Sequence, residues 1–328
     1  MLTRFLLTLV LICSSGCLSL SFSGGSYDKR SVSIVSLDLF NQRAPEELSK
    51  NPWRGDWLFR RERLLVIDKY LRDRKPDVIL LQGAMSRIGS ATENDLKIIG
   101  QGGLDGYDFD QVAVARYRDT GEVESHAIAV GLPLQLVTLP SNYQRIWEFE
   151  GGGRLTLFLI EIEESEVAIF GLSGPSDASK TNLYLKNASL VMEKTVAKYR
   201  LCPLRMAVYG YLKLPADKSD YSRFLTRFRL KNISDGFCEI VSDCYTASPV
   251  NEIYMTTSGG GAPSQLDYIL VPRASFVGSS LVIFKEPDIG NLFGRAYGQE
   301  KFWATERFGW STQVQFSKCE LGDFTLEP

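Results

Sequence analysis

The pattern of apolar and polar positions predicts a strand, a helix and a second strand near the beginning of the chain. Residues 31–40 alternate short apolar and polar side chains, which is the two-residue period of a strand. Residues 58–72 place apolar side chains at the spacing of an amphipathic helix, with charged residues on the other face. Residues 77–81 are a continuous apolar run rich in β-branched side chains, typical of a strand covered on both faces.

The middle of the chain predicts antiparallel hairpins followed by a long helix. Residues 127–130 and 134–137 are two apolar runs broken by glycine and proline, and a polar turn separates the runs at 154–161 and 166–171. Residues 183–199 then have the period of an amphipathic helix. Because hairpins imply antiparallel pairs, a purely parallel doubly wound sheet is disfavoured.

Shorter segments complete the series toward the end of the chain. Residues 221–228 predict a third helix with basic residues on its open side. The remaining runs predict strands at residues 204–209, 266–271, 282–284 and 313–316. Strands and helices therefore interleave, and the length of 328 residues, with 44% hydrophobic composition, fits one large α/β domain.

The first 17 residues predict an export signal. Arg4 supplies a positive charge, residues 5–12 are apolar, and small residues lead up to Cys17. The apolar stretch is too short to span a bilayer. The alternatives to a cleaved signal that ends at Cys17 are ordinary secretion with another cleavage site and an uncleaved membrane anchor.

The end of this segment resembles the lipobox of bacterial lipoproteins, in which Cys17 would carry the lipid, although Ser14 stands where that motif normally has leucine. Leu18 differs from the aspartate that resembles an inner-membrane retention signal, so we expect an outer-membrane lipoprotein in the bacterial envelope. Residues 18–30 are predicted to be a flexible tether, and residues 31–328 a single domain.

Export places the later cysteines in a compartment that permits disulfides. Cys202, Cys238, Cys244 and Cys319 allow three pairings, of which Cys238 with Cys244 would close a local turn. Their spacing is not that of a zinc site. Four reduced, buried thiols are the alternative.

Charge argues against one class of partner. The chain has 37 basic and 39 acidic residues, a formal net charge of −2. Sustained contact with a phosphate backbone requires a clear positive excess, so nucleic acid is not an expected ligand.

The order of these segments resembles the endonuclease/exonuclease/phosphatase superfamily, the DNase I-like fold, over most of residues 31–316. The resemblance rests on the first strand, which contains Asp38, the Lys-Pro-Asp strand at 75–82, the hairpins and the late Leu-Asp-Tyr-Ile strand that contains Asp267. It implies two mixed β-sheets packed face to face with helices outside.

The same resemblance implies metal-assisted phosphoester chemistry, and this chain departs from it at most positions. Asp38 replaces an asparagine, and Gly83 stands where the family has a metal-binding glutamate. The histidine expected in the segment 171–174 is absent, Gly-Asp-Phe-Asn becomes Gly-Tyr-Leu-Lys at 210–213, and Ser-Asp-His becomes Ser-Thr-Gln at 311–313.

Asp38 and Asp267 alone survive of the larger set, and two carboxylates make a poor magnesium site. Catalytic groups that act as a unit do not replace one another. We therefore expect a non-catalytic relative that needs no cofactor, is anchored to the membrane by lipid, and serves binding or structure with an unidentified envelope partner.

The alternative is an active phosphodiesterase or phosphatase with a rearranged site. Asp38 and Asp267 would then hold magnesium or manganese, and His126, the only histidine, would act as a base. No partner motif surrounds His126, which we expect to open a strand as a surface or edge residue.

Overall fold

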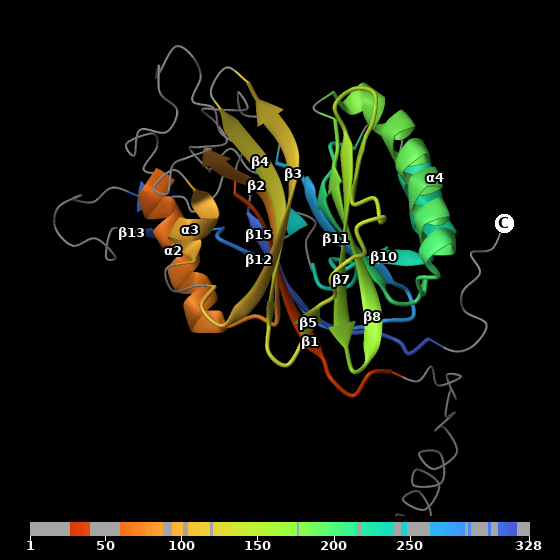
Figure 1. Ribbon diagram of the computed structural model, residues 1–328, viewed down its shortest axis with the longest axis horizontal. Coiled ribbons are helices and arrows are strands. Elements are labelled where there is room, and N and C mark those ends of the chain that lie inside the picture. The colour runs from red at the N-terminus through yellow and green to blue at the C-terminus, as the bar shows by residue number, and fades with distance from the viewer. Residues whose placement is uncertain are drawn as a thin grey trace, which may run out of the picture.

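A computed structural model describes most of the chain after the export signal. The described residues are 27–39, 60–87, 94–100, 104–118, 121–175, 177–214, 218–238, 244–247, 263–285, 288–289, 301–302 and 308–319. Within them, two mixed β-sheets lie face to face, and helices cover their outer faces (Figure 1). The fold class predicted from the sequence is confirmed.

The first sheet has six strands in the order β12, β15, β1, β2, β4, β3. Their bounds are β12 Phe276–Ile283, β15 Gly309–Gln315, β1 Val32–Asp38, β2 Val78–Arg87, β4 Glu122–Gly131 and β3 Tyr107–Tyr117. Only β1 and β2 pair in parallel. Helices α2 (Arg60–Arg74) and α3 (Asp95–Ile99) pack on the outer face through buried leucine and isoleucine side chains.

The second sheet has the order β10, β11, β9, β8, β7, β5, and β6 also pairs with β7. Their bounds are β10 Leu230–Asn232, β11 Asp267–Pro272, β9 Met206–Tyr211, β8 Ser165–Ser173, β7 Arg154–Ile162, β5 Gln135–Leu136 and β6 Ile146–Glu148. Strands β8 and β9 pair in parallel. Helices α4 (Thr181–Tyr199) and α5 (Ser219–Arg227) cover this sheet, and the short helix η2 (Ala178–Lys180) leads into α4. A separate pair of strands is formed by β13 (Asp288–Ile289) and β14 (Lys301–Phe302).

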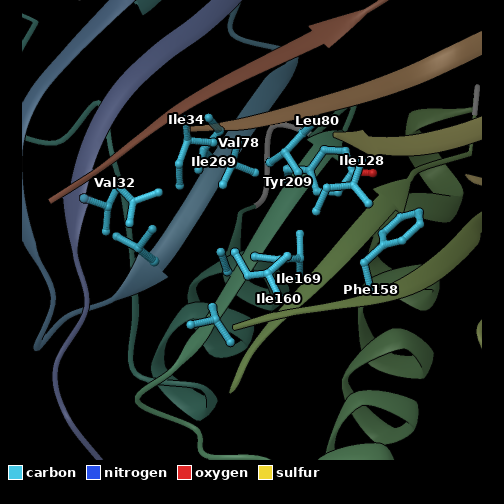
Figure 2. Packing of buried hydrophobic residues seen from close by; sticks show 14 of the residues in the cluster. Val32, Ile34, Val78, Leu80, Ile128, Phe158, Ile160, Ile169, Tyr209 and Ile269 are labelled. Carbon is cyan, nitrogen blue, oxygen red and sulfur yellow. The ribbon is translucent and has the colours of Figure 1, made fainter. Parts of the chain in front are cut away.

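Successive side chains along a strand point to opposite faces of its sheet, so the apolar side chains form three core layers. One lies between the two sheets, and one lies under the helices on the outer face of each sheet. Ile34 of β1 points into the space between the sheets, whereas its neighbour Val35 packs toward α2. Figure 2 shows the central layer, where Leu80 and Ile128 of the first sheet approach Tyr209 and Phe158 of the second. Burial of this layer from both sides holds the two sheets together.

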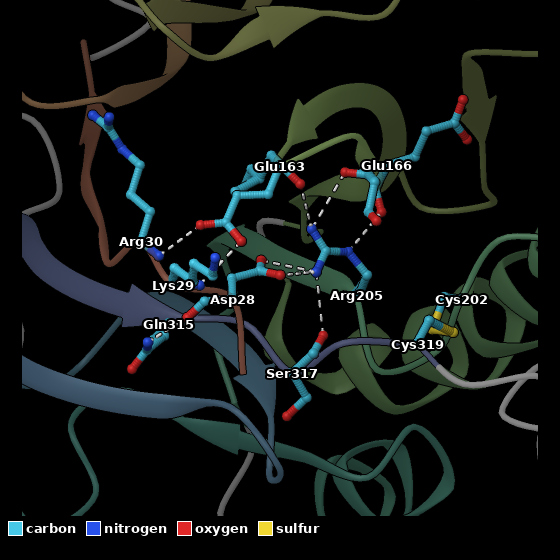
Figure 3. A network of polar contacts seen from close by, with 12 residues as sticks. Asp28, Lys29, Arg30, Glu163, Glu166, Cys202, Arg205, Gln315, Ser317 and Cys319 are labelled. Atoms are coloured by element: carbon cyan, nitrogen blue, oxygen red, sulfur yellow. Dashed lines mark hydrogen bonds and ion pairs between the residues drawn. A yellow bond between two sulfur atoms is a disulfide. The ribbon is translucent and has the colours of Figure 1, made fainter. Parts of the chain in front are cut away.

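Residues 27–30 belong to the folded domain, which corrects the tether predicted over 18–30. Tyr27 bridges to Ser317, and Asp28 is buried against Arg205, with both carboxylate oxygens 2.8 Å from Nη1 (Figure 3). The Glu163 carboxylate accepts hydrogen bonds from the backbone N–H groups of residues 29 and 30. The alternating pattern alone does not reveal these contacts, because their partners lie more than 130 residues away.

Arg205 is the centre of this arrangement. It donates six hydrogen bonds, two to Asp28 and four to backbone carbonyls, one of which belongs to Ser317. The beginning and the end of the described chain therefore meet at one buried guanidinium.

Two disulfides join Cys202 to Cys319 and Cys238 to Cys244, the second being the local pair named from the sequence. Both are compatible with an exported protein. Among the residues described, no helix is long and apolar enough to cross a membrane. The predicted signal segment and Cys17 lie outside the described residues.

Candidate functional site

The two aspartates predicted from the sequence, Asp38 and Asp267, lie at the same end of the sandwich. Strands β1, β2, β8 and β9 end there, and β4, β7, β11 and β15 begin there. Asp38 is the last residue of β1 in the first sheet, and Asp267 is the first residue of β11 in the second. Polar side chains from both sheets therefore face one space.

Four polar side chains form one row across the second sheet. Arg154 pairs with Ser173, Ser173 with Tyr211, and Tyr211 with Asp267. Two residues further into the strands, Tyr209 and Ile269 of the next row belong to the core between the sheets. Side chains two residues apart share a face, so this row lines the inner edge of the second sheet.

The backbone of β2 is shaped for glycine where the resemblance implies a glutamate. Gly83 has a φ of 62°, and the pairing of β2 with β4 is irregular between Leu81 and Ala84. That φ lies in the left-handed region, where a glutamate side chain would add strain. Asp38, which pairs with Gln82, therefore has no carboxylate at the next position of β2.

Close contact between the sheets requires a second glycine. Gly210 has a φ of 136°, and a Cβ there would collide with the carbonyl oxygen of Leu172 and with Nε2 of Gln82. Gln82 itself donates a 2.7 Å hydrogen bond from Nε2 to that carbonyl. An amide therefore bridges the two sheets beside Asp38.

Two more hydrogen bonds cross between the sheets at this end. The Trp310 indole N–H donates to the backbone oxygen of Asp267 at 2.9 Å. Nδ1 of His126 lies 3.0 Å from Oγ1 of Thr156. Together with the hydrogen bond of the Gln82 amide, three polar contacts therefore join the two sheets at this end.

His126 is buried in the middle of β4, which corrects its expected position at the opening of a strand. Strand β4 begins at Glu122, so the imidazole is flanked by strand on both sides and is 1% exposed. Burial, with a smaller effect of the Arg154 charge, lowers the pKa of His126 to about 3. So low a pKa makes the neutral imidazole a weak proton acceptor, and burial shields it from water; neither property suits a general base.

Sequence reasoning missed a buried glutamate at the same end. The carboxylate of Glu124 accepts a 2.9 Å hydrogen bond from the Tyr117 hydroxyl, and Arg154 approaches it to 3.9 Å from the opposite sheet. Burial raises the pKa of Glu124, although Tyr117 and Arg154 act in the opposite direction. The alternation of Glu122, Glu124 and His126 along one face of a strand is the signal that would have revealed it.

The last strand corrects the expectation that residues 311–313, matched to the family's Ser-Asp-His, lie at the site. Ser311, Thr312 and Gln313 pair with β1 inside the sheet, opposite residues 35, 34 and 33. Strand β15 begins at Gly309, earlier than the run predicted at 313–316, so Gly309 and Trp310 are its residues nearest the site.

The residues present do not fit a divalent cation. Asp38 and Asp267 come from different sheets, and the part of the chain that the structure describes contains no group of three or more histidine, cysteine, aspartate or glutamate residues able to hold a metal ion. Lys213, in place of the family's asparagine, is exposed, and its backbone oxygen accepts a 2.8 Å hydrogen bond from Thr181. A hard cation prefers several oxygen ligands, which this arrangement does not bring together.

Comparison with solved structures finds extensive similarity at low sequence identity. An endonuclease/exonuclease/phosphatase family protein from Bacteroides thetaiotaomicron is 17% identical, with a TM-score of 0.60 over 88% of this chain and 99% of that chain. A mannosyl-6-phosphatase from the same species is 17% identical, with a TM-score of 0.59 over 86% and 99%. TDP2 from D. rerio, solved with a single-strand DNA product, is 10% identical, with a TM-score of 0.53 over 87% and 98%. No protein-family model and no curated protein matches the chain.

Proposed function

We propose that this chain, which has the DNase I-like fold of endonuclease/exonuclease/phosphatase proteins, is an exported, lipid-anchored envelope protein that has lost hydrolysis and serves binding or structure. The fold is that of hydrolases, and the two disulfides are compatible with export. The lipid anchor rests on Cys17 and the small residues before it.

One observation carries the loss of hydrolysis: glycine is built into the site where metal chemistry would need a carboxylate. Gly83 holds a left-handed backbone conformation, with a φ of 62°, at the position where the resemblance implies a metal-binding glutamate. Restoring a glutamate there would strain the backbone, so this departure from the family's pattern is built into the fold. Phosphoryl transfer without charge neutralisation at the phosphate oxygens loses its main source of rate.

The second candidate is a hydrolase with a rearranged site. The observation in its favour is Glu124, a buried carboxyl group with a raised pKa at the same end of the sandwich as Asp38 and Asp267. Carboxyl groups with a perturbed pKa often lie at functional sites. Magnesium or manganese would be its cofactor.

A hydrolysis assay separates the two. The purified chain is incubated with magnesium or manganese and with phosphodiester and sugar-phosphate substrates, and compared with Asp267→Ala. Asp73→Ala, which removes an exposed carboxylate from α2, is the matched control. We expect no metal-stimulated turnover; turnover that Asp267→Ala abolishes and Asp73→Ala retains would establish the hydrolase instead.

Labelling with a fatty acid tests the anchor separately. Cells that express the chain are grown with radiolabelled palmitate, and the label is compared between wild type and Cys17→Ala. We expect label only on the wild type. Equal labelling of both would remove Cys17 as the acceptor.

A further inference from the structure

We infer that the outer face of α4 and α5 is a docking surface for anionic phospholipid. This inference rests on the proposed lipid anchor for its location, and it extends that proposal from one attachment point to a surface. The helical layer is the outermost layer of the second sheet, at the right of Figure 1.

Charge is concentrated in this layer. Residues 181–200 and 219–229, which form α4, α5 and the residues that follow them, contain seven basic and two acidic residues, whereas the whole chain has a formal net charge of −2. The exposed basic residues of this layer are Lys186, Lys194 and Lys198 on α4, Arg223 and Arg227 on α5, and Arg200 and Arg229, which follow these helices. Such an excess on one face attracts a negatively charged surface.

The acidic residues of these helices do not cancel that excess. Glu193 forms an ion pair with Arg227, and Asp220 forms one with Arg223 at 2.9 Å. Each acid is therefore engaged with an arginine of α5, and Glu193 is the single acidic residue within α4, whereas the helix carries three lysines.

Two exposed leucines favour lipid over other anionic partners. Leu183 is 49% exposed and Leu190 is 41% exposed, and their seven-residue spacing places them on one stripe of α4 with Lys186 and Lys194. Leucine between lysines is the composition of a helix that lies on a membrane, because the apolar side chains enter the headgroup region while the lysines contact anionic lipids. A nucleic-acid backbone would gain nothing from the leucines.

The face also lies near the point where the chain would leave the membrane. Arg200 follows the last turn of α4, and nearby Arg205 binds Asp28 at the start of the described chain (Figure 3). Nine residues separate Cys17 from Tyr27, and a fully extended segment of that length spans at most roughly 35 Å. A lipid on Cys17 would therefore keep this end of the helical face close to the bilayer.

Vesicle flotation tests the inference without the lipid anchor. The full chain carrying Cys17→Ala is mixed with vesicles of phosphatidylcholine alone, or of phosphatidylcholine with phosphatidylglycerol. The apolar leader is common to every variant, so the difference between the two vesicle types reports on the charged face. We expect preferential binding to the anionic vesicles that weakens as salt is raised.

Two charge-reversal variants locate the surface. Lys186→Glu with Lys194→Glu should weaken binding to anionic vesicles by more than roughly tenfold. Arg116→Glu with Arg118→Glu, an equal change at exposed positions of the first sheet, should leave it unchanged. Leu190→Ser should weaken binding without changing the charge, and near-UV circular dichroism verifies that every variant is folded.

Equal effects of the two double variants, or equal binding to both kinds of vesicle, would overturn the inference. So would binding to duplex DNA in the absence of vesicle binding. A failure of palmitate labelling would affect only the anchor, since the vesicle experiment uses the chain without it. Metal-stimulated hydrolysis would likewise overturn the loss of activity and leave the docking surface unaffected.

Discussion

Replacing His126 by glutamine should remove a specific part of the pH dependence of stability. His126 is the only histidine of the chain, so no other imidazole titrates in the same range. In the folded protein it is buried beside Thr156 and its pKa is about 3. In the unfolded chain the same group returns to a pKa of about 6.5.

The sign and size follow from proton linkage. Below pH 6.5 the unfolded chain binds a proton at His126 and the native protein does not, so the free energy of unfolding falls as the pH falls, until the pKa of about 3 is reached. Between pH 7.5 and 5.5 this one group should account for a loss of about 1.4 kcal/mol.

Urea unfolding measures this loss. The buried Trp310 provides a fluorescence signal, and midpoints and slopes are recorded at pH 7.5, 6.5 and 5.5 for wild type and His126→Gln. The variant is expected to be less stable at pH 7.5, but its stability should fall by about 1.4 kcal/mol less between the two limits. Carboxylates that titrate in both proteins cancel in this difference. If both proteins lose the same stability on acidification, the imidazole is not buried and neutral as described.

Two further predictions concern the packing. In urea unfolding, Gly210→Ala should lower the free energy of unfolding by about 3–5 kcal/mol, because a Cβ there meets the Leu172 carbonyl and the φ is positive. The control is Gly278→Ala, where the atom nearest to the added Cβ would lie at an ordinary 3.5 Å, and it should change the free energy of unfolding by less than about 1 kcal/mol. Equal losses in the two variants would count against the contact at Gly210. Arg205→Leu should cost about 3–5 kcal/mol because it leaves the Asp28 carboxylate buried without its guanidinium, and adding Asp28→Asn should recover part of that loss; strictly additive effects in the double-mutant cycle would contradict the pairing.

The local pattern of apolar and polar residues was sufficient to predict a strand or helix wherever burial of the element imposes a regular period. The alternation at residues 31–40 and the continuous run at 77–81 predicted β1 and β2, since burial imposes those periods directly. Strand β3 was missed because it lies at the edge of its sheet and carries polar or exposed side chains on both faces over much of its length. Its pairing with β4, rather than its own composition, makes it a strand.

The candidate site was predicted only in part, because its contacts join residues far apart in the chain. The sequence placed Asp38 in the strand predicted at 31–40 and Asp267 in the strand predicted at 266–271, and the structure shows that each lies at an end of its strand. The contact of Arg154 with Glu124 depends on how the two sheets face each other, which no local period encodes. The burial of His126 followed from the early start of β4, four residues before the imidazole.

The position of β1 has a consequence for the order in which the molecule assembles. This strand is the first in the chain, yet it lies inside its sheet, between β2 and β15, with Val32 opposite Val314. During synthesis one edge of β1 has no partner until β15 has emerged, and contacts of such long range form slowly. A ribosome-bound fragment that ends before Gly309 would therefore hold an open strand edge, a template for unwanted pairing between chains.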